Sequence, residues 1–146
     1  MACLPILEYP DPRLRIRATP VETVGDEIRQ LIADLLETMY EAPGIGLAAT
    51  QVNVHKRILV TDISEERNEP YCLINPEILS QEGEITYEEG CLSVPTVCVP
   101  TLRAEIAVIE YEDVEGEKHE LNATGLLAAV VQHEIDQLQG DVIVEK

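Results

Sequence analysis

The chain has 146 residues, 45% of them hydrophobic and 26% charged, so residues 1–146 fit a single folded globular domain. Its formal net charge of −18 argues against binding to nucleic acid or to an anionic membrane, because both need a basic surface. No stretch is long and apolar enough to span a membrane, and the N-terminus lacks the pattern of a signal peptide, so we expect a cytoplasmic protein.

The first half of the chain predicts a short helical turn, a long helix and two strands. The long helix is indicated by apolar residues that recur every three or four positions, as on one face of an α-helix. The strands are indicated by short apolar runs bounded by turn residues. The expected elements are a turn opening at Asp11-Pro12, a helix from about Gly25 to Tyr40, a strand at Arg57–Asp62, and a strand at Tyr71–Ile74 that Asn75-Pro76 stops.

The second half predicts a β-hairpin followed by a final helix. Residues alternate in character from Ala104 to Tyr111, and a turn around Gly116 leads into a second strand at Lys118–Leu121. The final helix should begin at Thr124 and end before Gly140, a residue suited to a left-handed C-terminal cap. Its middle is apolar on all sides, which predicts a central, buried helix. The order of elements indicates an α+β fold.

The final helix contains His133-Glu134-Ile135-Asp136-Gln137, which differs at one position from the zinc-hydrolase motif H-E-x-x-H. That motif places two imidazoles one helical turn apart, with a glutamate beside them that acts on water. Here Gln137 stands where the second imidazole is expected. A histidine and an amide in a buried structural network is an alternative that the helix alone leaves open.

Two further segments carry residues that could take part in catalysis or metal binding. In Gly44–Gln51, glycines permit close approach of a backbone, and the Gln51 amide could donate to a developing oxyanion, although the segment also reads as a tight helix-to-strand connection. In Glu88–Pro95, acidic neighbours disfavour Cys91 as a thiolate nucleophile, whereas a nearby cation would make it a ligand. In isolation, Cys91 equally suits a small buried side chain.

Together, Gly44–Gln51, Glu88–Pro95 and His133–Gln137 closely resemble the three signature segments of peptide deformylase, a family that removes the N-formyl group from nascent polypeptides. The resemblance covers essentially the whole chain, from Leu4–Leu7 to Gly140. It implies an α+β fold with antiparallel or mixed sheets around a central C-terminal helix. It also implies a single domain without the additional C-terminal helix of longer members.

The resemblance implies a role for each matched residue. The family binds one divalent metal, often Fe(II) and replaceable by Zn, Ni or Co, at positions that correspond to Cys91, His133 and Gln137. The general acid/base corresponds to Glu134. The groups that hold the formyl oxygen correspond to Gln51 and the backbone N–H of Leu92. The substrate groove corresponds to Ile45, Gly46, Gly90 and Val130. Two supporting roles are implied, a pairing of Glu89 with Arg103 and support of the site by Asp136.

Gln137 is the largest departure from the family pattern. An amide oxygen is a poorer ligand for Fe(II) or Zn(II) than an imidazole, so metal affinity and turnover should both fall. A second departure is Thr96–Cys98, which lacks the arginine that many bacterial members place near the far end of the substrate. Two hypotheses follow: a monomeric enzyme acting on N-formyl-methionyl peptides and nascent chains, or an impaired relative that binds peptide N-termini without cleavage.

Overall fold

The computed structural model describes residues 3–8, 11–42, 44–91 and 94–140, and the side chains within them except those of residues 88–99. The described residues contain two α-helices, α1 (Asp26–Glu41) and α2 (Gly125–Leu138), and two short 3-10 helices, η1 (Pro12–Arg15) and η2 (Ala49–Val52). The strands are β1 (Gly46–Ala48), β2 (Ile58–Thr61), β3 (Tyr71–Glu82), β4 (Ile85–Cys91), β5 (Val94–Arg103), β6 (Ile106–Glu112) and β7 (Lys118–Thr124).

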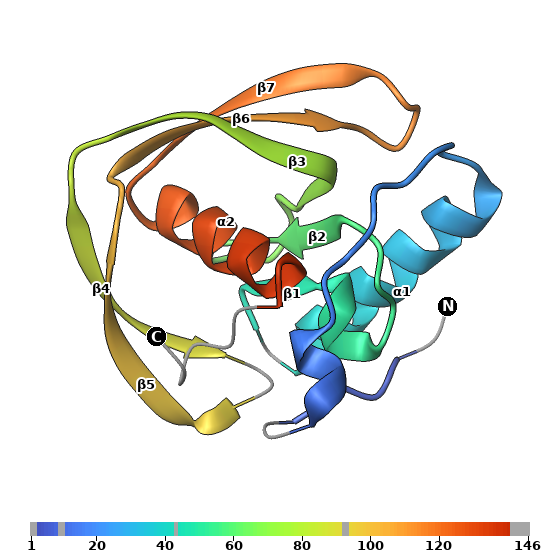
Figure 1. The fold of residues 1–146 in the computed structure, drawn as a ribbon, viewed down its shortest axis with the longest axis horizontal. Coiled ribbons are helices and arrows are strands. Elements are labelled where there is room, and N and C mark those ends of the chain that lie inside the picture. The colour runs from blue at the N-terminus through green and yellow to red at the C-terminus, as the bar shows by residue number, and fades with distance from the viewer. Residues whose placement is uncertain (1–2, 9–10, 43, 92–93, 141–146) are drawn as a thin grey trace.

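The strands form two antiparallel sheets that border α2. One sheet has five strands in the order β1-β2-β3-β6-β7, and the other consists of β4 and β5. Helix α2 crosses the middle of the molecule (Figure 1). Strands β3, β6 and β7 lie on one side of it, and the long, bent β4–β5 ribbon lies on another side. The predicted α+β fold around a central C-terminal helix is therefore confirmed. Neither helix of the described residues has the length and apolar character that a membrane span requires.

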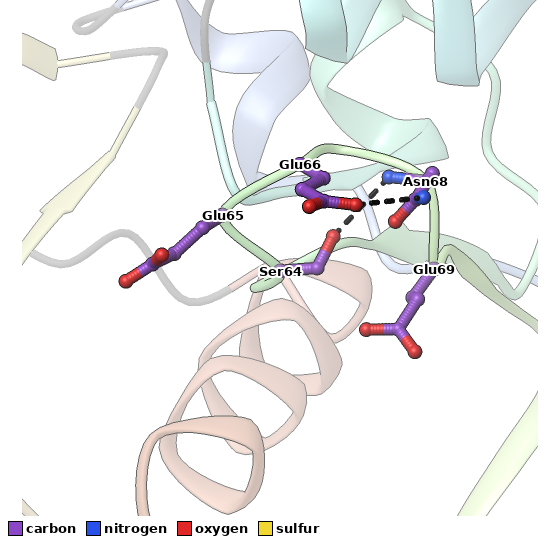
Figure 2. A pocket seen from close by; sticks show the side chains of 5 residues that line it. All are labelled: Ser64, Glu65, Glu66, Asn68 and Glu69. Atoms are coloured by element: carbon purple, nitrogen blue, oxygen red, sulfur yellow. Dashed lines mark hydrogen bonds between the residues drawn. The ribbon is translucent and has the colours of Figure 1, made fainter.

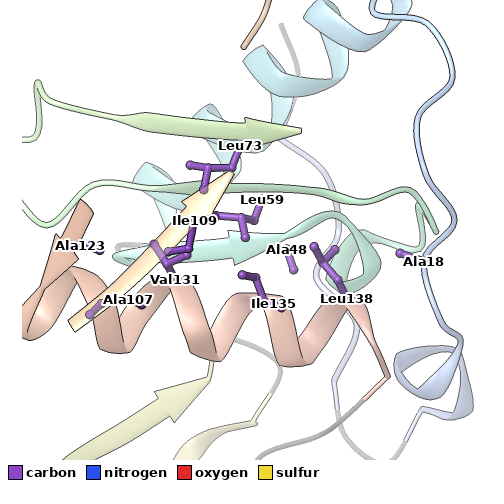
Figure 3. Packing of buried hydrophobic residues seen from close by; sticks show 11 residues of the cluster. Ala18, Ala48, Leu59, Leu73, Ala107, Ile109, Ala123, Val131, Ile135 and Leu138 are labelled. Carbon is purple, nitrogen blue, oxygen red and sulfur yellow. The ribbon is translucent and has the colours of Figure 1, made fainter. Parts of the chain in front are cut away.

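One of two hydrophobic core clusters among the described residues lies between α2 and the five-stranded sheet. Val131, Ile135 and Leu138 of the helix face side chains of the sheet that include Leu59 and Ile109 (Figure 3). Every residue from 128 to 135 is buried, as expected for a helix that is apolar on nearly all sides. Polar residues placed on this helix are consequently held in the interior.

The predicted helices agree with the structure to within one residue, because their sequence signals are strong. Helix α1 begins one residue after Gly25, which is its N-cap. Helix α2 follows Thr124 as N-cap and ends one residue before Gln139, after which Gly140 adopts a φ of +87°. The side chain of Asp11 accepts a hydrogen bond from the Arg13 backbone at the start of η1, as expected for a helix cap.

The prediction that Asn75-Pro76 stops a strand is wrong. Strand β3 runs through both residues to Glu82, with a break in its register against β6 between Ile74 and Glu77. At this bulge Asn75 has a φ of 52°, and its side chain accepts from the Val21 backbone N–H at 2.8 Å and donates to the Val21 carbonyl at 2.9 Å. A bulge leaves a residue outside the ladder, so proline is tolerated there.

Several strand bounds also differ from the predictions. Strand β2 is shorter by one residue at each end, β6 begins two residues after Ala104, and β7 extends three residues beyond Leu121. The β4–β5 ribbon and the short strand β1 were not predicted as strands. In β5, Pro95 and Pro100 obscure the strand pattern, since proline is uncommon inside sheets.

Gln132 ties α2 to the connection between β5 and β6. Its Nε2 donates to the carbonyl oxygens of Ala104 at 2.8 Å and Ala128 at 2.9 Å, and its Oε1 accepts from the Ala104 backbone N–H at 3.1 Å. Without the Gln132 amide, the backbone N–H and the carbonyl of Ala104 each lose a hydrogen-bond partner. We expect Gln132→Ala to lower the free energy of unfolding by about 1–2 kcal/mol, measured by urea denaturation. The exposed Gln139, changed to alanine, is the matched control, and equal losses in both variants would contradict this role.

Candidate active site

Strand β1 and helix α2 meet at Gly46 and Glu134. A Cβ atom built on Gly46 would lie 2.6 Å from Glu134 Oε2 and 2.9 Å from Val130 Cγ1. Both distances are shorter than real carbon contacts, so only glycine lets the β1 backbone pass this close to the helix. The glycine-rich segment and the histidine-glutamate segment, recognised separately in the sequence, therefore lie against each other.

Three polar residues of the α2 motif, His133, Glu134 and Gln137, are buried. The exposed fractions are 6% for His133, 4% for Glu134 and 1% for Gln137. Burial of an ionisable group is costly unless other groups compensate it, and such groups often occur at functional sites. His133 and Gln137 are one helical turn apart, as the sequence predicted.

The η2 segment is bonded to α2 and to β1, which fixes the Gln51 side chain. Thr50 Oγ1 donates to the carbonyl oxygen of Gln137 at 3.1 Å, and the Ala48 backbone N–H donates to Gln51 Oε1 at 2.9 Å. Because Ala48 holds the oxygen of the Gln51 amide, the nitrogen is the opposite, donating end. Sequence reasoning did not identify Thr50 as a link between the two segments, although its position next to Gln51 was a signal.

Strand β1 forms one edge of the five-stranded sheet. Gly46 pairs with Thr61 of β2, and among the described strands none pairs with the other side of β1. The preceding residue, Ile45, is 41% exposed, whereas Val130 of α2 is 8% exposed. Gly46, one of the residues predicted to line a peptide groove, thus lies on an edge strand. An exposed sheet edge is a common place for an extended peptide to bind.

The second predicted segment, Glu88–Pro95, contains the end of β4, a strand that contacts α2. Gly90 pairs with Cys98, and Cys91, the last residue of β4, pairs with Val94 after a break in register. The side chains of Cys91 and Glu89 and the whole of Leu92 lie outside the described residues, so their predicted roles remain predictions. Both β4 and β5 contact α2.

Arg103 at the end of β5 forms an ion pair with Asp136 of α2. Their side chains are 8% and 23% exposed, so the pair is largely shielded from water. The predicted partner Glu89 lies among the undescribed side chains. Asp136 therefore contacts the β4–β5 ribbon, which is consistent with support of the site through Arg103.

The predicted donor set suits a divalent metal only in part. A thiolate and an imidazole are good ligands for Fe(II) or Zn(II), but the neutral amide of Gln137 is a weak one. The burial of His133 and Gln137 on one helix turn provides the placement that two ligands of one ion need. The third donor, the Gln137 amide, is the one that does not suit a divalent metal.

A separate group of potential metal ligands lies on the β6–β7 hairpin and was missed in the sequence. The ligand atoms of Asp113, Glu117 and His119 lie within 4.8 Å of one another. Their close spacing around Gly116 was the available signal. The backbone N–H of Glu117 and the imidazole of His119 hold the pKa of Asp113 below its usual value. Through these bonds, the Asp113 carboxylate already stabilises the turn between β6 and β7.

Comparison with known proteins shows the family of the chain. Residues 3–146 match the family model for polypeptide deformylase. A peptide deformylase of Neisseria meningitidis is 57% identical over 146 residues, covering 100% of this chain and 87% of that protein. The chain belongs to the peptide deformylase family. Peptide deformylase 2 of Xanthomonas axonopodis pv. citri is 53% identical over 148 residues, covering 99% of this chain and 87% of the relative.

Solved deformylase structures share the fold. A peptide deformylase from Legionella pneumophila has a TM-score of 0.94 and 44% identity, covering 98% of this chain and 85% of that one. A peptide deformylase from Ehrlichia chaffeensis in complex with actinonin has a TM-score of 0.95 and 41% identity, covering 99% of this chain and 88% of that one. The deformylase-like fold predicted from the sequence is confirmed.

Proposed function

We propose that this deformylase-family protein binds N-formyl-methionyl peptides and hydrolyses their formyl group, with turnover limited by Gln137. The observation that supports this most strongly is the close approach of Gly46 to Glu134. It brings the edge strand, where a peptide backbone would bind, directly against the residue proposed to move protons. A purely structural helix would not need a carboxylate buried at that contact.

In the proposed reaction, the peptide backbone extends the sheet at the edge of β1, beside Ile45 and Gly46. The amide nitrogen of Gln51 and the backbone N–H of Leu92 donate to the formyl oxygen as it gains negative charge. Glu134 accepts a proton from the attacking water and returns it to the leaving amine nitrogen. The C–N bond breaks, and the products are formate and a peptide with a free N-terminus.

Cys91, His133 and Gln137 are the residues that would hold a divalent metal. When bound, such a metal supplies Lewis-acid activation of water near neutral pH. Val130 would contribute to the apolar pocket for the methionine side chain, and Gly90 to the opposite wall of the groove. The metal identity proposed from the family is Fe(II), with Zn or Ni as replacements.

Gln137 supports a second candidate function, which is peptide binding without cleavage. Loss of one strong ligand weakens metal binding but leaves the edge strand β1 and the contact of Gly46 with Glu134 unchanged. Under either function we propose a monomer that acts on nascent chains in the cytoplasm, where formyl-methionyl N-termini arise.

Metal content and formate release test the two functions together. The protein is purified without air in the presence of Fe(II), its bound metal is measured, and formate released from a formyl-Met-Ala-Ser peptide is followed. Substoichiometric metal with slow formate release is the expected result. Metal-free protein that binds the peptide without releasing formate would replace the enzymatic function by the binding function. Protein that neither binds nor cleaves the peptide would overturn both.

A further inference from the structure

Asp62 is a fully buried carboxylate that the proposed reaction does not use. Its exposed fraction is 0%. Oδ2 accepts from the Tyr40 hydroxyl at 2.7 Å and the Glu69 backbone N–H at 3.2 Å, and Oδ1 accepts from the Ser64 backbone N–H at 2.9 Å and hydroxyl at 2.5 Å. Burial of a carboxylate is costly, and these four bonds compensate it. Asp62 thus fixes the loop after β2 to helix α1.

Arg67 of the same loop connects Asp62 to the segment that precedes β1. Its guanidinium donates to the carbonyl oxygen of Asp62 at 3.0 Å and also to the carbonyl oxygen of Gly44. It lies over the Tyr40 ring, with Cζ 5.0 Å from the ring centroid, which adds a cation–π interaction. The backbone of Arg67 has a φ of 60°, unusual for a residue with a side chain, so the loop is held in a specific conformation.

The carbonyl groups of Gly44 and Ile45 are therefore both held from the β2 side. In addition to the Arg67 bond on Gly44, the Asp62 backbone N–H donates to the Ile45 carbonyl at 3.0 Å, and Thr61 Oγ1 donates to it at 2.6 Å. These two residues immediately precede Gly46. These bonds therefore fix the backbone that leads into β1.

The loop itself is closed by short-range bonds. Ser64 Oγ accepts from the Asn68 backbone N–H at 3.2 Å, and Asn68 Nδ2 donates to Glu66 at 3.4 Å (Figure 2). The glutamate side chains of this loop, Glu65, Glu66 and Glu69, are exposed. Arg67 takes no part in these two bonds, so the bonds that close the loop and the bond that holds Gly44 involve different side chains.

We infer that Tyr40, Asp62 and Arg67, here called the Asp62 cluster, position strand β1 for peptide binding. Arg67 is the positioning residue, because it contacts the Gly44 carbonyl just before the strand. The peptide-binding part of this inference rests on the proposed function. Arg67 touches no reacting atom. It acts through the backbone carbonyl of Gly44, so its loss should weaken peptide binding more than it slows any chemical step.

The test compares Arg67→Ala with Arg29→Ala. Arg29 is a matched control, because its guanidinium also donates to a distant backbone carbonyl, that of Val114 at 2.8 Å, and to a second oxygen, on the Asp26 carboxylate at 2.9 Å, away from β1. Amide hydrogen exchange of residues 45–48 is measured in the peptide-free proteins. The dissociation constant for formyl-Met-Ala-Ser is measured in parallel, or KM where turnover occurs.

We expect Arg67→Ala to speed exchange in residues 45–48 and to raise the dissociation constant or KM about tenfold, with kcat within about threefold of its original value. Arg67→Lys should resemble Arg67→Ala, because an ammonium cannot reproduce the two-carbonyl contact of the guanidinium. Arg29→Ala should change neither quantity.

Three outcomes would overturn the inference. Unchanged exchange in residues 45–48 would show that the cluster does not hold β1. Faster exchange with unchanged peptide affinity would reduce Arg67 to a stabilising residue. Equal effects of Arg67→Ala and Arg29→Ala would indicate general destabilisation. Failure of the unaltered protein to bind the peptide would instead overturn the proposed function, and the exchange rates would still decide whether the cluster holds β1.

Discussion

Replacing Gln137 by histidine should raise the affinity of the protein for Fe(II) or Zn(II) by more than about 10-fold. The reason is that an imidazole is a much stronger ligand than a neutral amide, and changes even to residues behind the ligands alter metal affinity by about 10–100-fold. Gln137 is 1% exposed, and its backbone carbonyl is held by Thr50, so a new side chain at this position begins from a fixed backbone. Bound metal is measured after anaerobic purification and dialysis against a series of free-metal concentrations.

Gln139→His is the control for this prediction. Gln139 lies at the exposed end of the same helix, so the control adds an imidazole without placing it beside His133. We expect its metal affinity to equal that of the unaltered protein. A Gln137→His variant that binds metal no better than the Gln139→His variant would show that the amide is not the defect.

Replacing Gly46 by alanine should remove most of whatever deformylase activity the protein or its Gln137→His variant has. The added methyl would lie 2.6 Å from Glu134 Oε2 and 2.9 Å from Val130 Cγ1, so the carboxylate or the strand must move. A displacement of about 1 Å in a catalytic site can reduce the rate about 100-fold. Overpacking of this kind should also lower the free energy of unfolding by about 1–3 kcal/mol. Formate release and urea denaturation are the two measurements.

Gly25→Ala is the matched glycine control. No atom lies within 4 Å of a Cβ built on Gly25, and this residue caps α1 away from the α2 motif. It should leave formate release unchanged. Retention of full activity by Gly46→Ala would mean that the close approach of β1 to α2 has no part in catalysis.

The helices were predictable because their patterns are local. Apolar residues of α1 and α2 recur with the helical period, and glycines mark the start of one helix and the end of the other. Strand β3 was misjudged because the bulge at Asn75-Pro76 depends on distant contacts with Val21. The β4–β5 ribbon was missed because its register is set by pairing between two segments with prolines and a glycine, and not by alternation within either one.

The residue types of the candidate site were predictable, but their contacts were not. The spacing of His133, Glu134 and Gln137 on one helix follows from the helical period. The contact between Gly46 and Glu134 joins segments that are far apart in the chain, and a glycine in the sequence does not reveal what approaches it. The same holds for Asp62, whose buried carboxylate accepts hydrogen bonds from Tyr40 of α1 and from Ser64 and Glu69 of the loop after β2.

The rate of formate release from formyl-Met-Ala-Ser, compared between the unaltered protein and its Gln137→His variant under anaerobic conditions with Fe(II), tests the central claim most directly. A deformylase site limited by its third ligand predicts slow release by the unaltered protein and a kcat/KM at least about tenfold higher in the variant. It also predicts loss of that gain when Glu134→Gln is added. A variant that binds the metal and the peptide but releases formate no faster than the unaltered protein would contradict the account.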